Sequence, residues 1–195
     1  MNLSIRLIDL RGKKMKDKIS FIFDTETNGL NNCSVLSISF IISQYDKVLA
    51  KETRYYFAKE SYNKKAIKVN GLTKEVIKSK RKGCSYPLYF EDDYNWLVDI
   101  MKKYRVNNIV AHNTNFDIKF LPRQIKEKIE DNTYSIYCTM KNNSKFVGIK
   151  KGNRYKYPSL SEACKAYGIN FDDNEAHSSE YDTLKAYELF VATMK

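Results

Sequence analysis

The sequence has few features that would crosslink the chain or carry it into a membrane. It includes four cysteines, Cys33, Cys84, Cys138 and Cys164, and no two of them form a C-x-x-C pair or a zinc signature. We therefore expect reduced thiols. No apolar run approaches the roughly eighteen residues of a membrane span, and residues 1–18 are too interrupted by charge to be a secretory signal. These absences favour a cytoplasmic protein, bacterial or viral in a host cell, without a membrane partner.

Acidic residues are also scarce. The chain has 23 Asp and Glu against 34 Lys and Arg, which gives a net charge of +11. Such an excess favours a polyanionic partner, although a chain rich in Lys, Asn, Tyr and Ile is also what an AT-rich genome encodes. Charge alone therefore leaves nucleic-acid binding open.

Residues 132–161 contain no acidic residue at all. Their basic and aromatic residues are Lys141, Lys145, Phe146, Lys150, Lys151, Arg154, Tyr155, Lys156 and Tyr157. Cations interleaved with aromatic rings suit phosphate contacts and base stacking, so Lys150, Lys151 and Arg154 are predicted to bind substrate. A solvated basic loop is the alternative.

The pattern of apolar residues predicts one domain. Residues 1–18 form a basic N-terminal extension, and residues 19–195 form the domain, because this length and a 43% hydrophobic content suffice for one core. Strands are expected over 19–23, 35–43, 47–57, 107–111 and 134–139. Helices are expected over 63–70, 73–80, 90–104, 115–129, 159–167 and 178–194, with a kink or break at Pro122. Three antiparallel strands followed by alternating strands and helices indicate an α/β fold, a mixed five-stranded sheet flanked by helices.

Two carboxylates stand at the end of the first predicted strand. Asp24 and Glu26 are two residues apart, so on an extended strand their side chains point to the same side. Such close like charges repel each other unless a cation lies between them, and hard oxygen ligands suit Mg²⁺ or Mn²⁺. A solvated surface pair is the ordinary alternative, but the end of a buried strand is a frequent place for a site.

Two later segments carry further candidates. Asp117 falls in the first turn of a predicted helix, just after the strand and loop that contain His112 and Asn113. His177 precedes another helix, whose first turns contain Asp182. Helix capping and loop hydrogen bonding would account for each residue separately. However, the chain has only two histidines, and both fall within these segments.

The three segments, in this order, resemble the motifs of the DnaQ-like DEDDh 3′→5′ exonucleases, the family of the proofreading ε subunit of DNA polymerase III. FDTETNGL from residue 23 resembles the first motif, VAHNTNFDIKFL from residue 110 the second, and the H-x₄-D spacing from residue 177 the third. VNGLT from residue 69 and YPSL from residue 157 resemble two intervening stretches of the family. The resemblance covers roughly Ile19 to Met194 and implies a ribonuclease H-like fold.

The resemblance also implies a mechanism. Asp24, Glu26, Asp117 and Asp182 would hold two Mg²⁺ or Mn²⁺ ions that assist an in-line displacement at phosphorus. His177 would be the general base that takes a proton from the attacking water, and the product would be a nucleoside 5′-monophosphate. These five are the predicted catalytic residues.

Substrate contacts are implied for five further residues: Thr25, Thr27, Leu30, Asn113 and Phe116. Leu30 resembles the family's apolar wedge beside the terminal base, although ordinary core packing would also explain Leu30 and Phe116.

Single-stranded DNA is the expected substrate, and RNA is the alternative because the same residues would hydrolyse it. A non-catalytic binding subunit, or a partner of a polymerase or DNA-processing complex, are the remaining alternatives.

Overall fold

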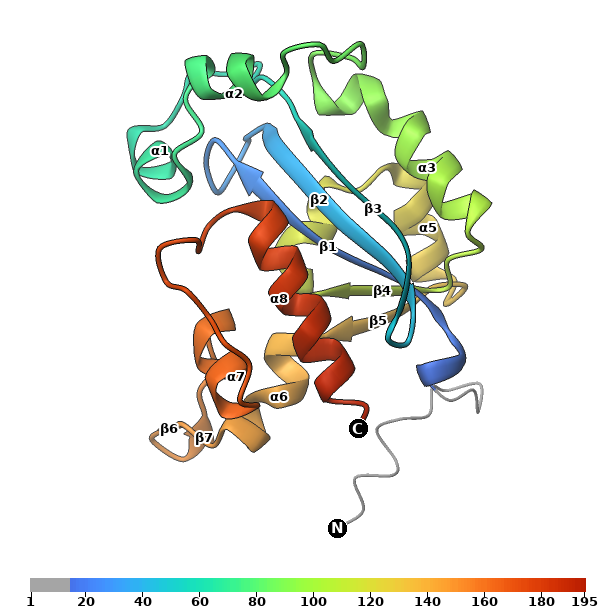
Figure 1. The fold of residues 1–195 in the computed structure, drawn as a ribbon, viewed down its shortest axis with the longest axis vertical. Coiled ribbons are helices and arrows are strands. Elements are labelled where there is room, and N and C mark those ends of the chain that lie inside the picture. Colours follow the sequence, from blue (N-terminus) through green and yellow to red (C-terminus); the bar gives the residue numbers. More distant parts are fainter. Residues whose placement is uncertain (1–14) are drawn as a thin grey trace.

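A computed structural model describes residues 15–195, and its centre is a five-stranded sheet in the order β3-β2-β1-β4-β5 (Figure 1). The strands are β1 (Ile19–Thr27), β2 (Val35–Gln44), β3 (Lys47–Tyr55), β4 (Asn108–Ala111) and β5 (Ser135–Cys138). β2 pairs antiparallel with both β1 and β3, whereas β4 pairs parallel with both β1 and β5. The predicted α/β fold with a mixed sheet is confirmed.

Helices cover both faces of this sheet. They are α1 (Lys64–Asn70), α2 (Lys74–Lys80), α3 (Tyr94–Lys103), α4 (Thr114–Asp117), α5 (Arg123–Glu130), α6 (Thr139–Val147), α7 (Leu160–Ala166) and α8 (Ser179–Ala192), with 3₁₀ turns over Met15–Asp17, Phe90–Asp93 and Ile118–Phe120. The predicted helix over 115–129 is interrupted at Pro122, which precedes α5 and has no N–H to donate. Each of the other predicted helices is present.

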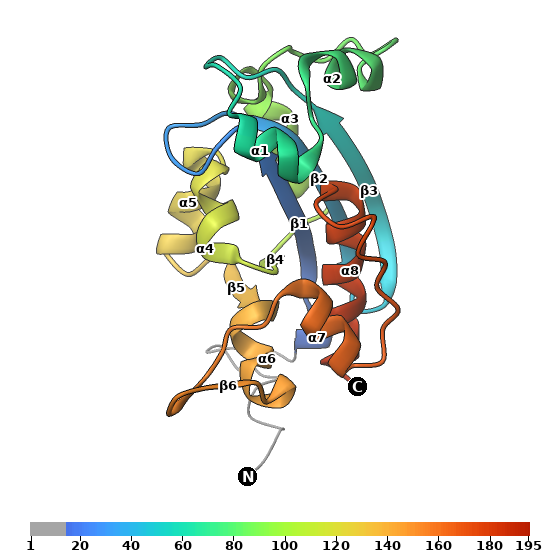
Figure 2. The ribbon, with the colours of Figure 1, turned by 90° about the vertical axis from the view of Figure 1, so that its left-hand side faces the viewer.

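Alternation along the strands separates two cores. Phe21 and Phe23 of β1 pack with Phe40 of β2 on the face that α3 and α5 cover. Ile22 points to the opposite face and packs with Phe190 of α8. Figure 2 shows α8 on one side of the sheet and α4 and α5 on the other. β1 is therefore buried on both faces.

Side-chain hydrogen bonds fix α8 against β2. Ser37 Oγ lies 2.9 Å from Ser179 Oγ. The Thr183 hydroxyl donates to the Ser39 carbonyl oxygen at 3.1 Å. Because all four residues are buried, these contacts set the position of the first turns of α8 relative to the sheet.

The first strand extends beyond the predicted range. β1 continues to Thr27, because it stays paired with β2 as far as Thr27 and Val35 after its pairing with β4 has ended at Ile22. The run of apolar residues that predicted the strand ends at Phe23, because the polar residues from Asp24 onward do not pack in a core although they remain in the strand. Asp24 and Glu26 thus lie within the strand.

An α-helix and a hairpin in the basic segment 132–161 were not predicted. α6 follows β5 directly, and the antiparallel pair β6 (Lys150–Lys151) and β7 (Arg154–Tyr155) forms a hairpin. Neither shows an apolar periodicity in the sequence. The residues of both hairpin strands are exposed, so the structure leaves a solvated segment and a substrate-binding segment both open.

Residues 1–14 of the predicted N-terminal extension lie outside the described residues. Residues 15–18 pack against the domain: the Met15 side chain is buried with α8, and the Lys18 ammonium donates to Ser135 Oγ at 2.5 Å. Within residues 15–195, no helix combines the length and apolar character that crossing a membrane requires.

Replacing Phe190 with Ala should lower the free energy of unfolding by about 3–5 kcal/mol, because removing a buried ring leaves a cavity. Phe190 is 1% exposed, and its ring meets the Tyr137 ring edge-on. The matched control is Leu184→Ala on the outer side of α8, where the side chain is 41% exposed and the expected change is small, within about 1 kcal/mol. Urea unfolding followed by circular dichroism measures both, and equal losses would contradict the proposed inner face of α8.

Candidate active site

β1 presents two carboxylates at the place where its parallel neighbour ends. Asp24 and Glu26 alternate with buried residues and share the sheet face of Ile22, toward α8. β4 pairs with β1 only as far as Ile22, so both carboxylates lie beyond the last parallel pair. They therefore line the crevice at the carboxyl end of the parallel strands, as the sequence predicts.

Asp117 approaches β1 from the short helix α4. Its Oδ1 accepts hydrogen bonds from the Thr25 hydroxyl at 2.8 Å and from the Thr25 N–H at 3.2 Å. Asp117 is buried, at 3% exposure. Thr25 thereby connects the Asp117 carboxylate to the strand that carries Asp24 and Glu26.

Asp182 and His177 reach the same place from the start of α8. The His177 N–H donates to Asp182 Oδ2 at 3.1 Å, and His177 has a positive φ of 65°. Each of Glu26, His177 and Asp182 offers a ligand atom within 4.8 Å of the other two. Elements from both ends of the chain therefore converge on one point.

Burial and mutual repulsion raise the pKa values of these carboxyls. Burial raises the pKa of Asp24 well above its usual range, and the charges of Asp117, Glu26 and Asp182 add to that effect. Burial raises the pKa of Glu26 to about 8, against the opposing effect of a hydrogen bond from Asn70.

The two carboxyls outside β1 behave in the same way. Burial raises the pKa of Asp117 to about 7, although the Thr25 hydrogen bonds lower it. Burial raises the pKa of Asp182 to about 6, opposed by the His177 N–H and the His177 charge. Together, the four acids make a site whose full ionisation needs added positive charge.

The residues present fit a divalent cation. Asp182 Oδ1 is buried and has no hydrogen-bond partner among residues 15–195, which leaves a lone pair available to a ligand. The surrounding donors are hard carboxylate oxygens, the set that Mg²⁺ and Mn²⁺ prefer. Asp24 and Asp117 lie outside the three-residue group at 4.8 Å but contribute charge to it.

A cavity of about 340 Å³ adjoins the carboxylates. It is lined by four of the predicted substrate contacts, Thr25, Thr27, Leu30 and Phe116, and by Glu26. Leu30 is 76% exposed at the rim, so this side chain is not part of the core. The fifth predicted contact on this side, Asn113, is exposed but does not line the cavity.

Helix α1 supplies the cavity residues that the sequence analysis missed: Asn63, Lys65, Ala66, Val69 and Asn70. The Asn70 amide donates to the Thr27 carbonyl oxygen at 3.1 Å, and its Oδ1 accepts from the Leu72 N–H. The only available signal was the VNGLT stretch, which resembles the family but carries no charge pattern of its own.

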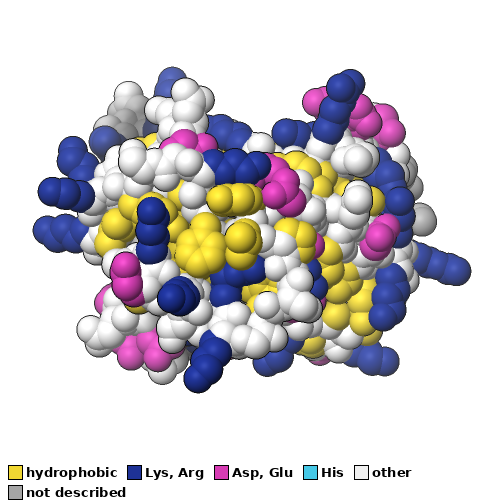
Figure 3. All heavy atoms as spheres, turned by 90° about the horizontal axis from the view of Figure 1, so that it is seen from above, with side chains coloured by type: hydrophobic (Ala, Val, Ile, Leu, Met, Phe, Trp, Pro, Cys, Tyr) yellow, Lys and Arg dark blue, Asp and Glu magenta, His cyan; other side chains and the backbone are white. Residues whose placement is uncertain are grey.

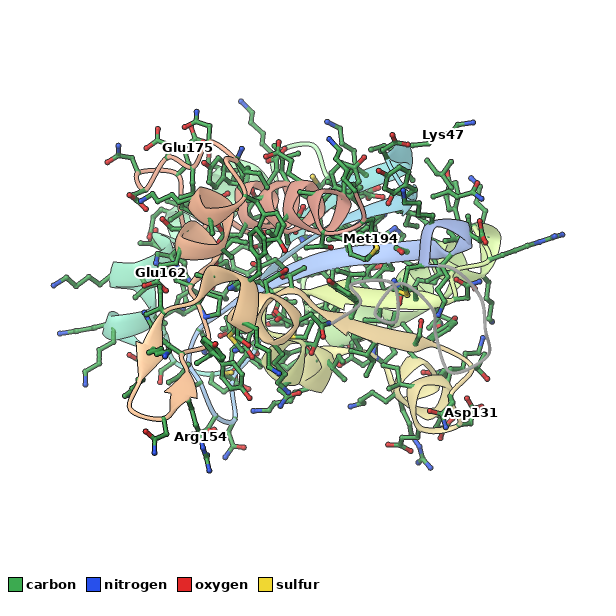
Figure 4. All side chains as sticks on the ribbon, turned by 90° about the horizontal axis from the view of Figure 1, so that it is seen from below. Lys47, Asp131, Arg154, Glu162, Glu175 and Met194 are labelled. Atoms are coloured by element: carbon green, nitrogen blue, oxygen red, sulfur yellow. The ribbon has the colours of Figure 1, made fainter. Side chains whose placement is uncertain are left out.

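The predicted basic contacts lie apart from this cavity. Lys150, Lys151 and Arg154 are exposed on the β6–β7 hairpin, and Arg154 projects outward from it (Figure 4). Figure 2 shows the hairpin at the lower end of the face whose upper end is formed by α1. The structure does not bring these three side chains to the carboxylates.

His112 connects the loop between β4 and α4 to the segment that leads from the hairpin into α7. Its Nε2 lies 3.0 Å from the Pro158 carbonyl oxygen, and its Nδ1 lies 3.0 Å from Thr139 Oγ1. Since a carbonyl oxygen only accepts, Nε2 carries the proton and Nδ1 accepts from the threonine. Burial lowers the pKa of His112 to about 4, so this imidazole is neutral and structural.

The sheet order and the acids at the end of its parallel strands are those of a ribonuclease H-like fold with a site that fits divalent cations. The family model RNase_T, described as "Exonuclease", matches residues 21–190. The chain therefore belongs to this exonuclease family, as the motifs predict.

Known relatives agree with this assignment. Ribonuclease T of Buchnera aphidicola subsp. Baizongia pistaciae is 30% identical over 91% of this chain and 84% of its own. The PolC-type DNA polymerase III of Ureaplasma parvum is 23% identical over 94% of this chain but only 12% of its own. The structure of exonuclease X in complex with 5′ overhanging duplex DNA superposes with a TM-score of 0.60 at 20% identity, over 90% of this chain and 91% of that one. At 20% identity, the likeness to exonuclease X shows a shared fold and nothing more.

In the absence of metal, the protein should become less stable as the pH rises from about 4 to about 8. Folding raises the pKa of Asp182 to about 6, of Asp117 to about 7 and of Glu26 to about 8. The folded state thus binds more protons than the unfolded state, and the stability present at low pH is lost through this window. Melting temperatures with chelator at pH 5 and pH 8 measure the loss, and added Mg²⁺ should reverse it at pH 8.

The control for this prediction is the double variant Glu26→Gln, Asp182→Asn. It removes two of the titrating groups, so its melting temperature should depend less on pH than that of the wild type. A wild-type melting temperature that stays constant or rises over the same range would contradict the predicted pKa shifts.

Proposed function

We propose that the protein is a 3′→5′ exonuclease that releases nucleoside 5′-monophosphates from DNA 3′ ends, preferring single strands. The observation that carries this proposal is the adjacency of an acidic cluster and a nucleotide-sized cavity, with Glu26 belonging to both. A terminal nucleotide in that cavity places its phosphodiester at the carboxylates. The family match to an exonuclease model supports the same activity.

Asp24, Glu26, Asp117 and Asp182 would hold two divalent cations, Mg²⁺ or Mn²⁺. The unpartnered Asp182 Oδ1 and the raised pKa values of the four acids support this assignment. When bound, the cations supply Lewis acidity toward the attacking water and offset negative charge on the leaving oxygen. The proposed count of two follows from the family resemblance and from four acids placed on three elements.

His177 is the proposed general base. Its imidazole lies beside Glu26 and Asp182, and its backbone is fixed to Asp182 by the hydrogen bond from its N–H. A water held between these side chains attacks phosphorus and gives its proton to the imidazole. The bond from phosphorus to the 3′ oxygen breaks, and that oxygen leaves with the shortened strand.

The cavity would position the terminal nucleotide. Leu30, Val69 and Phe116 offer apolar surface to the base, while Thr25 and Thr27 lie beside the carboxylates. Asn113 is the proposed contact with the least support, because it lies outside this cavity. The base contacts are sequence-tolerant, since any base can stack on apolar surface.

The β6–β7 hairpin would bind the strand on the other side of the scissile phosphate. Lys150, Lys151 and Arg154 are exposed and distant from the cavity, so they suit phosphates several nucleotides before the 3′ end. The His112 bond to Pro158 holds the segment after the hairpin against the catalytic loop.

RNA is the second candidate substrate. It is favoured by the likeness to ribonuclease T, the relative with 30% identity over most of both chains. The likeness to part of a PolC-type polymerase favours an association with a polymerase or another DNA-processing complex. The cytoplasm, where such enzymes meet nucleic acid, is the proposed location.

Asp182→Asn should reduce turnover by about 100-fold or more while sparing the fold. Asparagine has nearly the size of aspartate but no charge, so the variant loses the charge of a proposed metal ligand. The loss of a single catalytic contact typically has an effect of this order. A time course on 5′-labelled single-stranded DNA and RNA of matched sequence, with Mg²⁺, Mn²⁺ or chelator, measures this. Metal-dependent ladders that shorten from the 3′ end establish the activity, and the faster substrate identifies the preferred nucleic acid. Degradation by the variant at the wild-type rate would rule out the role of Asp182, and no degradation by the wild type would favour a non-catalytic binding module.

His177→Ala should lower the turnover rate by about 100-fold and leave substrate affinity nearly unchanged, because the lost group acts on the water. Single-turnover rates between pH 6 and 9 and a filter-binding assay separate the two quantities. The matched control is His112→Asn, which alters the other histidine and should affect stability more than the pH profile, because His112 is buried and neutral. Wild-type rates for His177→Ala across neutral pH would exclude the general-base role.

A further inference from the structure

A second basic surface lies on α1 and α2, beyond the segment that the sequence analysis considered. Residues 61–90 contain eight basic residues and one acid, Glu75, which gives 8 − 1 = +7, against +6 for residues 132–161. Arg81 is directed inward and donates to the carbonyl oxygens of Tyr55 and Tyr86. The other seven form what we call the α1–α2 lysine surface: Lys64, Lys65, Lys68, Lys74, Lys78, Lys80 and Lys82.

These lysines are exposed, and their charges are not neutralised by neighbours. No carboxylate within residues 15–195 forms an ion pair with any of the seven. Seen from above, this end of the molecule displays many Lys and Arg side chains, with fewer Asp and Glu side chains among them, around an apolar centre (Figure 3). Unpaired like charges at this density repel one another, and a polyanion would relieve that repulsion.

The surface rests on a rigid base. Ile77 and Leu72 are buried against Leu36 of β2. Asn63 and Thr73 cap the two helices with side-chain hydrogen bonds. Six of the seven lysines are therefore presented on fixed helices, and Lys82 lies in the turn that follows α2.

α1 also borders the cavity of the proposed terminal nucleotide. Lys65, Ala66 and Val69 line that cavity, and Asn70 is bonded to β1 through the Thr27 carbonyl oxygen. The lysine surface therefore begins where the cavity ends. The β6–β7 hairpin lies at the opposite end of the same face (Figures 1 and 2).

This arrangement, together with the proposed 3′→5′ direction on which the inference rests, decides which strand can reach the lysines. The 3′-terminal nucleotide ends in the cavity, so the rest of its strand leaves past the carboxylates, toward the hairpin. No phosphate of that strand continues toward α2. We propose that the α1–α2 lysine surface binds the backbone of the complementary strand of a duplex, where that strand runs past a recessed 3′ end.

The first test uses the wild-type protein and a series of substrates. A 3′ strand is labelled at its 5′ end and annealed to complementary strands that extend past it by 0, 5 or 10 nucleotides. The value of kcat/KM should rise with the length of this extension, by about tenfold in all, because each added phosphate contact strengthens binding. The gain should shrink at high salt. A series without any gain would overturn the proposal, whatever the variants do.

The second test compares three variants, each of which lacks three positive charges. Lys68→Gln, Lys74→Gln, Lys78→Gln removes the centre of the lysine surface without altering the cavity lining. Lys150→Gln, Lys151→Gln, Arg154→Gln alters the hairpin. Lys47→Gln, Lys102→Gln, Lys103→Gln is the control, with three exposed lysines away from α1 and α2. Glutamine keeps a helix propensity close to that of lysine, and circular dichroism checks the fold of each variant.

The outcomes separate this inference from the proposed function. The α1–α2 variant should lose about tenfold in kcat/KM on the 10-nucleotide extension and less than about twofold on single strands, and its salt slope should fall by about 2 on the extended duplex only. The hairpin variant should lose activity on both substrates, and the control on neither. If the α1–α2 variant loses kcat/KM equally on both substrates, the surface binds the cleaved strand. If its activity is unchanged, the surface is a solvated face. Either result would overturn the proposal. Wild-type activity on single strands tests the exonuclease assignment separately.

Discussion

The repulsion among four carboxylates, one of them buried and three half-buried, is the constraint on which the architecture depends. Asp24, Glu26, Asp117 and Asp182 come from β1, α4 and α8, and burial raises the pKa of each. Free side chains on a loop would move apart to reduce this repulsion. They stay together because each is attached to an element whose position is set elsewhere, by apolar packing and by buried hydrogen bonds. The stability of the cores thus compensates for an unfavourable site, a common arrangement in enzymes.

β1 connects the stable cores to the site, because it carries side chains of both cores as well as Asp24 and Glu26. Its odd-numbered phenylalanines enter one core, Ile22 enters the other, and the same alternation then directs Asp24 and Glu26 toward α8. β4 is short and ends its pairing at Ile22, which opens the crevice in which the carboxylates lie. The hydrogen bonds of Ser179 and Thr183 fix the position of α8 on the sheet, so that Asp182 lies opposite β1. A long parallel neighbour would have closed this space.

The surroundings of the site differ in character from one end to the other. An apolar cavity between β1 and α1 suits a base, while lysine-rich surfaces at both ends of the same face suit phosphates. His112 is the only histidine inside the fold among the described residues. As a neutral group, it joins the loop between β4 and α4 to the segment that follows the hairpin. The proposed binding and catalytic groups share β1, whereas α1 and the hairpin carry only proposed binding groups, so changes in these two elements would alter the substrate range without altering the carboxylates.

The sequence by itself determined the five strands and the mixed character of the sheet, most helices and the break at Pro122, and it pointed to the five residues that are proposed as catalytic. Those features depend on local spacing, namely alternation, apolar stripes and short motifs at the ends of elements. It did not indicate α6 or the β6–β7 hairpin, which lack an apolar period, nor the full length of β1. Only the tertiary structure decided that Asn70, Val69 and Lys65 border the cavity while Asn113 does not. It also decided that the lysines of α1 and α2 form no ion pair with an acid within residues 15–195. The physical reason is that pairing and enclosure depend on distances between elements remote in the chain, which spacing within a segment does not encode.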